Sequence, residues 1–314
     1  MKKNRHLLGI IYGCILICFT VYVLLDTFVI PREYVQVEKE DKDDDNTSGN
    51  NKNPSNDKNN TNNDSSFTNQ VIITDNSYSD KNISITITEY REYDTAIYVA
   101  DVILSSPEYL QTAFAKNAYG RNITQKPSEM ATNNNAIFAV NGDYYGARET
   151  GLVVRDGVIY RSSTSKDREN LVIYQDGTLD VITERGTNAE ELVENGALHI
   201  LSFGPGLIDD EQITVDKNDE VGQAMASNPR TAIGQLDDLH YIFVVSDGRT
   251  NVSDGLSLYE LANFMKELGA KTAYNLDGGG SSTMWFNGEI INNPISSGGK
   301  SKERSVSDIV YIGY

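Results

Sequence analysis

The feature that most constrains the fold is a long polar tract near the N-terminus. From about Val37 to Ser66 nearly every residue is Asn, Asp, Lys, Glu, Ser or Thr. Such a segment cannot bury enough apolar surface to offset the conformational entropy lost on folding, so it predicts a flexible tether. A partner-binding acidic segment is the alternative. We therefore expect a polar linker over residues 26–69 and one folded domain over residues 70–314.

An apolar run precedes this tract. Residues 7–25 carry no charge, and Lys2, Lys3 and Arg5 stand before them. The run is about long enough to cross a hydrocarbon core of roughly 30 Å as a helix. Basic residues on its N-terminal side predict a cytoplasmic tail over residues 1–6 and a domain outside the cell. Because no small-x-small cleavage pattern follows, a single-pass signal anchor in the cell membrane is favoured over a cleaved signal peptide or a buried core helix.

Charge and cysteine content exclude several classes of function. The formal net charge is −18, and residues 67–314 alone carry 19 Lys and Arg against 35 Asp and Glu. Nucleic acid is not expected as a partner, because its binding depends on neutralising phosphates with cations. The two cysteines, Cys14 and Cys18, both lie in the apolar run. The domain therefore has no disulfide, thiolate metal site or cysteine nucleophile.

Short β-type runs recur along the domain. Ile83, Ile85 and Ile87 alternate with polar residues, which predicts a strand with one buried face. Residues 240–246 form the most hydrophobic run, which is typical of a central strand. Further strands are expected at residues 96–104, 136–140, 151–155, 157–160, 171–174, 178–182, 231–235 and 306–312. The pattern predicts a single β-rich α+β (mixed α/β) domain with a mixed sheet and few helices.

Local signals indicate helices and one hairpin. Residues 258–268 carry apolar side chains at helical spacing, and Ser257 with Glu260 forms a capping box at their start. Residues 108–118 are also predicted to be helical. The dipeptide Asn287-Gly288 stands between two apolar pairs, which is a strong signal for a hairpin turn.

Polar and glycine-rich clusters adjoin several of these strands. They are residues 141–146, 202–206, 228–231, 246–249, 275–282 and 303–306. Strand ends are where α/β-type proteins place ligands, although a single Asp-Gly is more often a tight turn. The segment Asn275–Ser282 is more specific, because its three successive glycines lose much entropy on folding and their N–H groups can form an anion nest. It lacks the GxxxxGK[ST] pattern of a Walker loop.

Histidine chemistry is not expected. His199 and His240 are the histidines of the domain, and the surroundings of both in the sequence favour structural positions. No HExxH or Ser-His-Asp arrangement can be assembled from them. The chemistry is therefore expected to use carboxylates, amides and arginines.

Taken in order, the polar clusters resemble the phosphodiester glycosidase family. The motifs that carry the resemblance are Asn141–Tyr145, Phe203-Gly204-Pro205, Asn228–Gly234, Val245–Arg249, Gly255-x-Ser257-x-x-Glu260-Leu261, Asn275–Ser282 and Arg304-x-Val306-Ser307. They extend from roughly residue 95 to the C-terminus, and several ordered motifs are more specific than any one alone. The family often has Pro after the last arginine, where this chain has Ser305.

The resemblance implies hydrolysis of the bond between a sugar's anomeric carbon and phosphate. Phosphate is a good leaving group, so the site must chiefly neutralise its charge and activate water or stabilise the sugar cation. Asp277 is expected to be the catalytic carboxylate, with Asp247 or Asp143 as the second of a pair. The expected substrate and phosphate ligands are Arg230, Arg249, Arg304, Thr231, Asn141, Asn275, Gly278, Gly279, Gly280, Ser281 and Ser282. For each arginine, an ordinary ion pair is the alternative.

An acidic domain must still accommodate an anionic substrate. Either the pocket is locally basic, or a divalent cation such as Ca²⁺ or Mg²⁺ bridges the three aspartates and the phosphate. The expected partner is a phosphorylated glycan or a sugar-1-phosphodiester of the cell envelope, and the oligomeric state is left open. Two rival functions are a non-catalytic binder of phosphate-containing envelope polymers and a phosphodiesterase that breaks the P–O bond.

Overall fold

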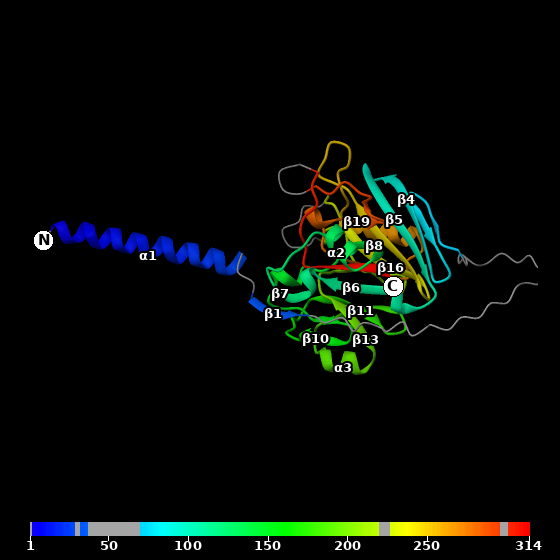
Figure 1. Cartoon of the computed structure of the whole chain (residues 1–314), viewed down its shortest axis with the longest axis horizontal. Helices are drawn as coiled ribbons and strands as arrows, with labels where there is room; N and C mark the ends of the chain where they lie inside the picture. Colours follow the sequence, from blue (N-terminus) through cyan, green and yellow to red (C-terminus); the bar gives the residue numbers. More distant parts are fainter. Residues whose placement is uncertain (1, 29–31, 37–69, 220–226, 296–300) are drawn as a thin grey trace, which may run out of the picture.

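The computed structural model describes residues 2–28, 32–36, 70–219, 227–295 and 301–314. Helix α1 (Lys2–Phe28) projects away from the β-rich domain (Figure 1). Its large apolar side chains between Ile11 and Leu25 are exposed, so it is not a core helix. Among the described residues, no helix is both long enough and apolar enough to cross a membrane. The anchor at residues 7–25 stays a prediction, and the tether over residues 37–66 lies outside the described residues.

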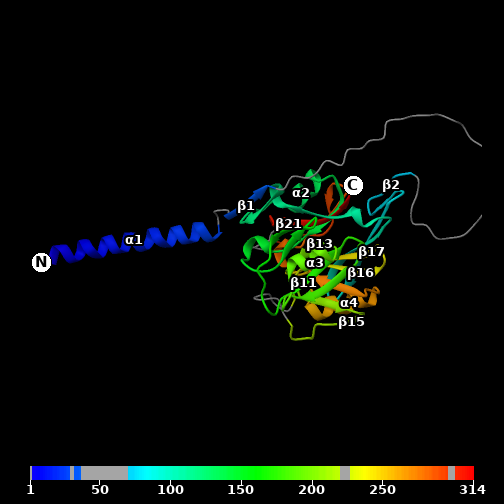
Figure 2. The same cartoon turned by 90° about the horizontal axis from the view of Figure 1, so that it is seen from below.

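Three large sheets and one small one form the domain (Figures 1 and 2). The largest has the strand order β15-β14-β18-β16-β17-β5-β4-β3-β2. Its strands are β2 Ile72–Ile73, β3 Ser77–Ser79, β4 Ile83–Glu92, β5 Thr95–Leu104, β14 Gly206–Asp209, β15 Gln212–Ile213, β16 Thr231–Asp237, β17 His240–Ser246 and β18 Thr272–Asn275. The predicted central strand, β17, is the fifth of these nine and pairs with β16 and β5.

A second sheet, of order β20-β19-β8-β21-β6, packs against the first, and a third, β10-β9-β13-β11-β12, lies beside both. The second contains β6 Leu110–Phe114, β8 Ala136–Asn141, β19 Met284–Phe286, β20 Glu289–Ile290 and β21 Asp308–Gly313. The third contains β9 Val153–Arg155, β10 Val158–Arg161, β11 Glu169–Tyr174, β12 Leu179–Thr183 and β13 Ala197–Leu201. The small sheet pairs β1 (Arg32–Gln36) with β7 (Ala118–Arg121).

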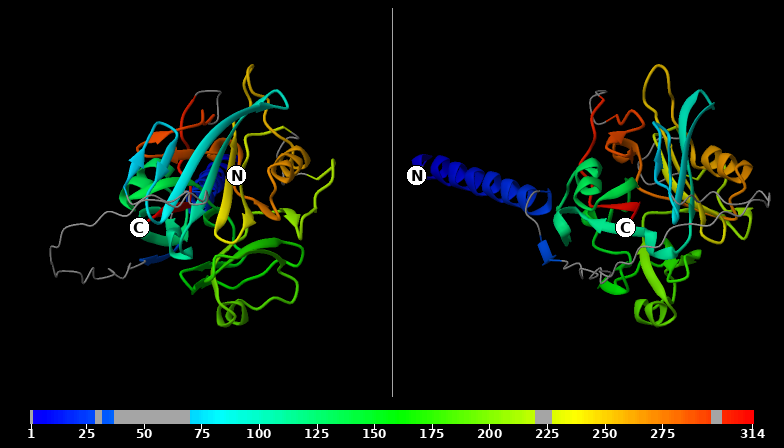
Figure 3. Two further views of the ribbon diagram at one scale, coloured as in Figure 1. Left: turned by 90° about the vertical axis from the view of Figure 1, so that its right-hand side faces the viewer. Right: turned by 45° about the vertical axis from the view of Figure 1, so that its right-hand side comes forward.

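The remaining helices are short and lie on the outside of the sheets. They are α2 Pro127–Asn133, α3 Ala189–Glu194 and α4 Leu258–Glu267, with 3₁₀ turns at Pro107–Tyr109, Ala115–Asn117, Tyr145–Ala147 and Gly279–Ser281. Helix α4 covers the outer face of the large sheet (Figure 3). The predicted capping box at its start is present, since Ser257 Oγ accepts from the Glu260 N–H and the Ser257 N–H donates to the Glu260 carboxylate.

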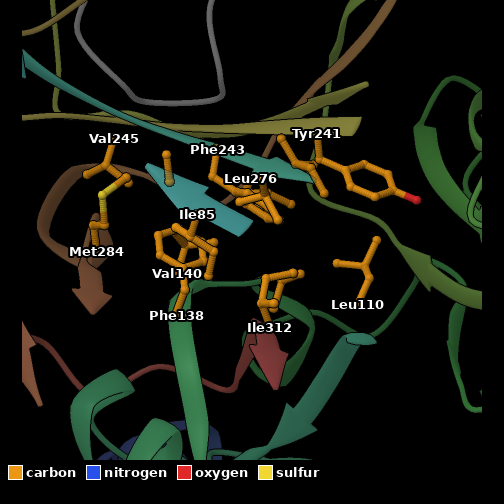
Figure 4. Packing of buried hydrophobic residues seen from close by; sticks show 14 of the residues in the cluster. Ile85, Leu110, Phe138, Val140, Tyr241, Phe243, Val245, Leu276, Met284 and Ile312 are labelled. Atoms are coloured by element: carbon orange, nitrogen blue, oxygen red, sulfur yellow. The ribbon is translucent and has the colours of Figure 1, made fainter. Parts of the chain in front are cut away.

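The main core fills the space between the large and the second sheet. Phe138 and Val140 on β8 face Ile85 on β4 and Phe243 on β17 (Figure 4). Alternate residues of β17 enter different cores, because Phe243 points inward while Val244 packs under α4. Both faces of β17 are therefore buried, which explains its continuous apolar run.

The predicted β-rich α+β class is confirmed. In detail, the strand pairings among the described residues are antiparallel throughout, whereas the sequence pattern predicts a mixed sheet. The helix predicted at residues 108–118 is wrong, because β6 occupies residues 110–114 and pairs with β21. A long-range pairing has overridden the local helix preference of this segment.

Candidate active site

The candidate site lies where the large and second sheets are joined by one segment. Strand β18 of the large sheet ends at Asn275, and the chain then crosses to β19 of the second sheet. On the way, the Asp277 N–H donates to Gly142 O (3.1 Å), while the Leu276 N–H donates to Thr231 O (2.8 Å). The ends of β8, β16 and β18 therefore meet at Asp277.

The buried polar side chains around this junction fix its geometry. Asn141 Oδ1 accepts from Thr231 Oγ1 (2.8 Å) and from the Thr283 N–H (3.1 Å). Its Nδ2 donates to Asp277 O (2.5 Å). Asn141 thus connects β8, β16 and the segment before β19. The structure gives Asn141 and Thr231 a positioning function in the loop of Asp277, and their contact with substrate or phosphate stays a prediction.

The glycines of this segment leave room for arginine side chains. A Cβ atom on Gly279 would lie 2.9 Å from Arg249 Nη2, and one on Gly280 would lie 2.6 Å from Arg304 Nη2. A Cβ atom on Gly278 would lie 3.0 Å from Pro229 O and 4.0 Å from Arg230 Cδ. The predicted phosphate ligands Arg230, Arg249 and Arg304 are therefore brought to one loop, although they are distant in sequence. Gly279 and Gly280 are required here because a side chain at either position would displace a guanidinium group, whereas one at Gly278 would press on Pro229 O.

Each arginine is held by the surrounding backbone or amide groups. Arg249 donates from Nε and Nη2 to Asn228 Oδ1 (3.0 and 2.7 Å), and the same Nη2 is the guanidinium atom nearest to the Cβ position of Gly279. The residue has a φ of 60°, in the left-handed region that a non-glycine residue rarely adopts. Arg230 is buried and donates from Nε to Leu256 O (2.8 Å).

Arg304 belongs to a segment that is fixed on both sides. The neighbouring Glu303 accepts from the Ser128 N–H and from Ser128 Oγ, both at 2.7 Å. On the other side, Val306 forms a bridge with Gln125. A cavity of about 420 Å³ lies beside α2 and β19, and Ser128 and Gln125 are among its lining residues. The N-terminal end of α2 therefore positions the loop that carries Arg304.

Asp277 is the predicted catalytic carboxylate, and its side chain is only 9% exposed. Oδ1 accepts from the Gly278 N–H at 2.9 Å, and the Ser281 hydroxyl also donates to the carboxylate. Burial raises the pKa of Asp277 to about 6, while the Ser281 hydrogen bond and the charge of Arg304 act in the opposite direction. A carboxylate with this pKa is ionised near neutral pH and is basic enough to accept a proton.

Asp247 is a second buried carboxylate, at the end of β17. Its Oδ1 accepts from the Asn293 N–H (2.8 Å) and from Asn292 Nδ2 (3.2 Å), and Tyr98 also donates to the carboxylate. Burial raises its pKa. Asn292 was not predicted as a site residue. It also donates to Ser282 O (3.1 Å), so it connects Asp247 with the glycine loop.

Asp143 has a different environment. Its Oδ1 accepts from the Tyr144 N–H (2.6 Å) and its Oδ2 from the Ser202 N–H (2.7 Å). Both carboxylate oxygens are thus engaged by backbone groups, which gives Asp143 a role in holding its loop. Its own N–H donates to Oδ1 of Asp308 (2.7 Å).

Asp308 and Arg155 form a buried ion pair that sequence reasoning missed. Their Oδ2 and Nη2 atoms are 2.5 Å apart and join β21 to β9. Burial raises the pKa of Asp308 to about 7, and Arg155 opposes this shift. Asp308 directly follows the motif Arg304-x-Val306-Ser307, and this position could have marked it as a candidate site residue. Arg155 stands in an ordinary strand sequence and could not have been recognised.

Two buried polar atoms beside Asp277 have no hydrogen-bond partner within the described part of the chain. They are Asn275 Oδ1 and Ser282 Oγ. Asn275 uses its Nδ2 to donate to Gly204 O (2.9 Å). Unsatisfied buried polar atoms are costly, so these two are candidates for contact with a ligand or with water.

The predicted aspartates do not form a metal centre. No group of three or more His, Cys, Asp or Glu side chains within the described ranges could hold a metal ion. The hydrogen bonds above also commit Asp143 to backbone N–H groups. The residues present therefore do not fit the Ca²⁺ or Mg²⁺ considered above. Of the two histidines, His199 is buried, and burial lowers its pKa to about 3, as expected for a structural residue.

The sequence is similar to a known family and to known proteins. A family model described as phosphodiester glycosidase matches residues 134–313. The uncharacterized protein YomE of Bacillus subtilis (strain 168), described as SPbeta prophage-derived, is 32% identical over 59% of this chain and 29% of its own length. The N-acetylglucosamine-1-phosphodiester alpha-N-acetylglucosaminidase of Mus musculus is 30% identical over 46% of this chain and 30% of its own length. The matches thus span less than a third of either relative.

Solved structures show the same fold. The catalytic domain of the zebrafish N-acetylglucosamine-1-phosphodiester alpha-N-acetylglucosaminidase, auto-inhibited by its pro-peptide, superposes with a TM-score of 0.59 at 22% identity, over 74% of this chain and 83% of that chain. A hypothetical protein from Synechocystis superposes with a TM-score of 0.53 at 14% identity, over 74% and 62% of the two chains. Because the family model covers more than half of the chain, this protein belongs to the phosphodiester glycosidase family.

Proposed function

We propose that the domain hydrolyses sugar-1-phosphodiesters in cell-envelope or extracellular glycans, breaking the bond between the anomeric carbon and the phosphate oxygen. The observation that carries this proposal is the convergence of the Arg249 and Arg304 guanidinium groups on one glycine loop beside Asp277. Guanidinium groups match the geometry of phosphate oxygens and keep their charge when buried.

In this proposal Arg249 and Arg304 bind the phosphate from two sides of the loop, and Arg230 adds positive charge behind it. Gly279 and Gly280 keep the surface free of side chains, so the phosphate can approach both guanidinium groups. As the C–O bond breaks, its electron pair goes to the phosphate oxygen, where the arginines stabilise the negative charge. Phosphate needs little protonation to leave, which is consistent with a site that contains no histidine among its named residues.

Asp277 supplies the base. It accepts a proton from the water that attacks the anomeric carbon, and its negative charge stabilises the positive charge that develops on the sugar. Asp247 is the second carboxylate near the loop, through Asn292 and Ser282. Its contribution would be electrostatic, because its Oδ1 is already engaged by two donors.

The direct test is hydrolysis of a panel of sugar-1-phosphodiesters, including an N-acetylglucosamine 1-phosphodiester, by the purified chain in ¹⁸O-labelled water. The proposal expects the label in the sugar, because water attacks carbon. Label in the phosphate would identify the rival phosphodiesterase reaction. Binding without turnover across the panel would support the rival polymer-binding function.

The location of the reaction is part of the proposal. We infer that residues 7–25 anchor the chain in the cell membrane and that the domain works outside the cell, where envelope glycans are found. The uninterrupted apolar run and the basic residues before it support this arrangement.

A further inference from the structure

The rim of the site carries an aromatic cluster that the proposed reaction does not yet use. Tyr144 is 44% exposed, whereas its neighbours Asp143 and Tyr145 are buried. The guanidinium carbon of Arg148 lies 5.8 Å from the centre of the Tyr144 ring and 4.9 Å from that of Phe203. An isolated exposed aromatic residue needs no explanation, but two aromatic rings that contact the same guanidinium group form a preorganised surface.

The cluster is held firmly by its surroundings. Arg148 Nη1 donates to Ser202 O (2.9 Å) and to Phe203 O (3.4 Å), so the arginine is fixed to the loop that carries Phe203. The Tyr144 backbone N–H donates to Asp143 Oδ1 at 2.6 Å. Tyr144 is therefore attached at its backbone and has the guanidinium group of Arg148 near one face of its ring.

Both loops of the cluster contact the segment that carries Asp277. Gly142, two residues before Tyr144, accepts from the Asp277 N–H at 3.1 Å. Gly204, directly after Phe203, accepts from Asn275 Nδ2 at 2.9 Å. Consecutive Cα atoms are about 3.8 Å apart, so the backbone of Tyr144 lies within roughly 8 Å of that of Gly142. The loop of Tyr144 is therefore hydrogen-bonded to the Asp277 segment at a position only two residues away from Tyr144.

We propose that Tyr144 is the stacking platform for the pyranose ring whose anomeric carbon faces Asp277. A pyranose presents a face of C–H groups, which are weakly positive and pack against the electron-rich face of an aromatic ring. Ligand sites commonly combine such an apolar surface with a few fixed polar groups. Here the arginines at the glycine loop would hold the phosphate, and Tyr144 would hold the sugar. The inference rests on the proposed function and adds a determinant of sugar specificity to it.

The test is a binding experiment that does not depend on turnover. The dissociation constants of N-acetylglucosamine 1-phosphate and of inorganic phosphate are measured calorimetrically with the full chain and with its Tyr144→Ala and Tyr144→Phe variants. Tyr144→Ala is expected to weaken binding of the sugar phosphate about tenfold and to change inorganic phosphate less than twofold. Tyr144→Phe, which keeps the ring, is expected to bind both within about twofold of the unmodified chain.

A matched control is available at the other end of the domain. Tyr314 is 59% exposed, and its hydroxyl group contacts Asp80, next to the end of β4 where Ile83 pairs with Leu104. The site is at the opposite end of these ten-residue strands, roughly 30 Å away at about 3.3 Å per residue. Tyr314→Ala should leave both dissociation constants unchanged.

The outcomes separate this inference from the proposed function. Equal binding of the sugar phosphate by Tyr144→Ala and the unmodified chain would overturn the platform, as would an unmodified chain that binds the sugar phosphate no better than inorganic phosphate. Parallel weakening of both ligands would also overturn it, because the change would then act on the phosphate site. Absence of hydrolysis by an unmodified chain that shows the expected binding pattern would refute the reaction and leave the platform standing.

Discussion

Replacing Asp277 by Asn should remove activity and stabilise the fold at the same time. The carboxylate is almost buried, and its pKa is raised to about 6 from the usual 3.8 of an aspartate. Burial is the largest cause of this shift. A neutral amide of nearly the same shape avoids this cost but cannot accept a proton from water. We expect kcat to fall by at least about 10².

The stability effect follows from the sign of the pKa shift. In the unfolded chain Asp277 ionises near pH 3.8, but in the folded protein only near pH 6, so ionisation favours unfolding. Below about pH 4 the ionisation of Asp277 takes nothing from the free energy of unfolding, and the loss of stability develops as the pH rises to about 6. One pKa unit corresponds to about 1.4 kcal/mol, so the cost above pH 6 reaches up to about 3 kcal/mol. The Asn variant should therefore be more stable at pH 8 and nearly equal to the original chain at pH 4.

Thermal or urea unfolding at the two pH values, together with kcat on the same preparation, tests this reasoning. For a domain of this size, 1 kcal/mol shifts Tm by roughly 2–4 °C, so the difference at pH 8 is measurable. A variant that is less stable at pH 8 but as active per folded molecule would show that Asp277 is only a turn residue. In that case the site assignment would be wrong, whatever the family.

The remaining predictions concern the arginines, the glycine loop and the tether. Arg249→Lys keeps the charge, but a lysine cannot bind Asn228 and phosphate with one planar group. The value of kcat/KM should therefore fall tenfold or more, which corresponds to about 1.4 kcal/mol. An unchanged kcat/KM would exclude bidentate binding by Arg249. Gly280→Ala places a methyl group against the guanidinium group of Arg304. Steady-state kinetics should show a similar loss of kcat/KM, while Tm changes little. Full activity would mean that Arg304 does not act from this position. Protease added to intact cells should cut within residues 37–66 and release the domain, whereas protection until lysis would contradict an outward-facing domain.

Local signals in the sequence predicted local structure well. The capping box of Ser257 and Glu260 is present in full, because it depends on residues three apart. The Asn287-Gly288 turn joins β19 to β20 as expected, with a positive φ at both residues. The helix predicted at residues 108–118 is wrong for the opposite reason. Strand β6 is determined by its pairing with β21, about 200 residues later in the chain. No local pattern contains that information.

The same distinction applies to the candidate site. Arginines and glycines in recognisable motifs could be named from the sequence, and the structure brings the three arginines to the glycine loop. Asn292 could not be named, because asparagines after a hairpin, such as Asn292 and Asn293, have many ordinary uses. Its role depends on contacts with Asp247 and Ser282, which only the fold creates.

The arrangement also bears on how an acidic domain can attract a phosphate. The surplus of 16 negative charges over residues 67–314 acts at long range, where salt screens it beyond about 10 Å. At the site itself, the guanidinium groups of Arg249 and Arg304 lie against one short loop, and the carboxylate beside them has a raised pKa. The two guanidinium groups would therefore supply positive charge to the proposed phosphate site at short range, where salt screening is weak. Such a site should be more sensitive to the loss of one arginine than to neutralisation of several surface carboxylates.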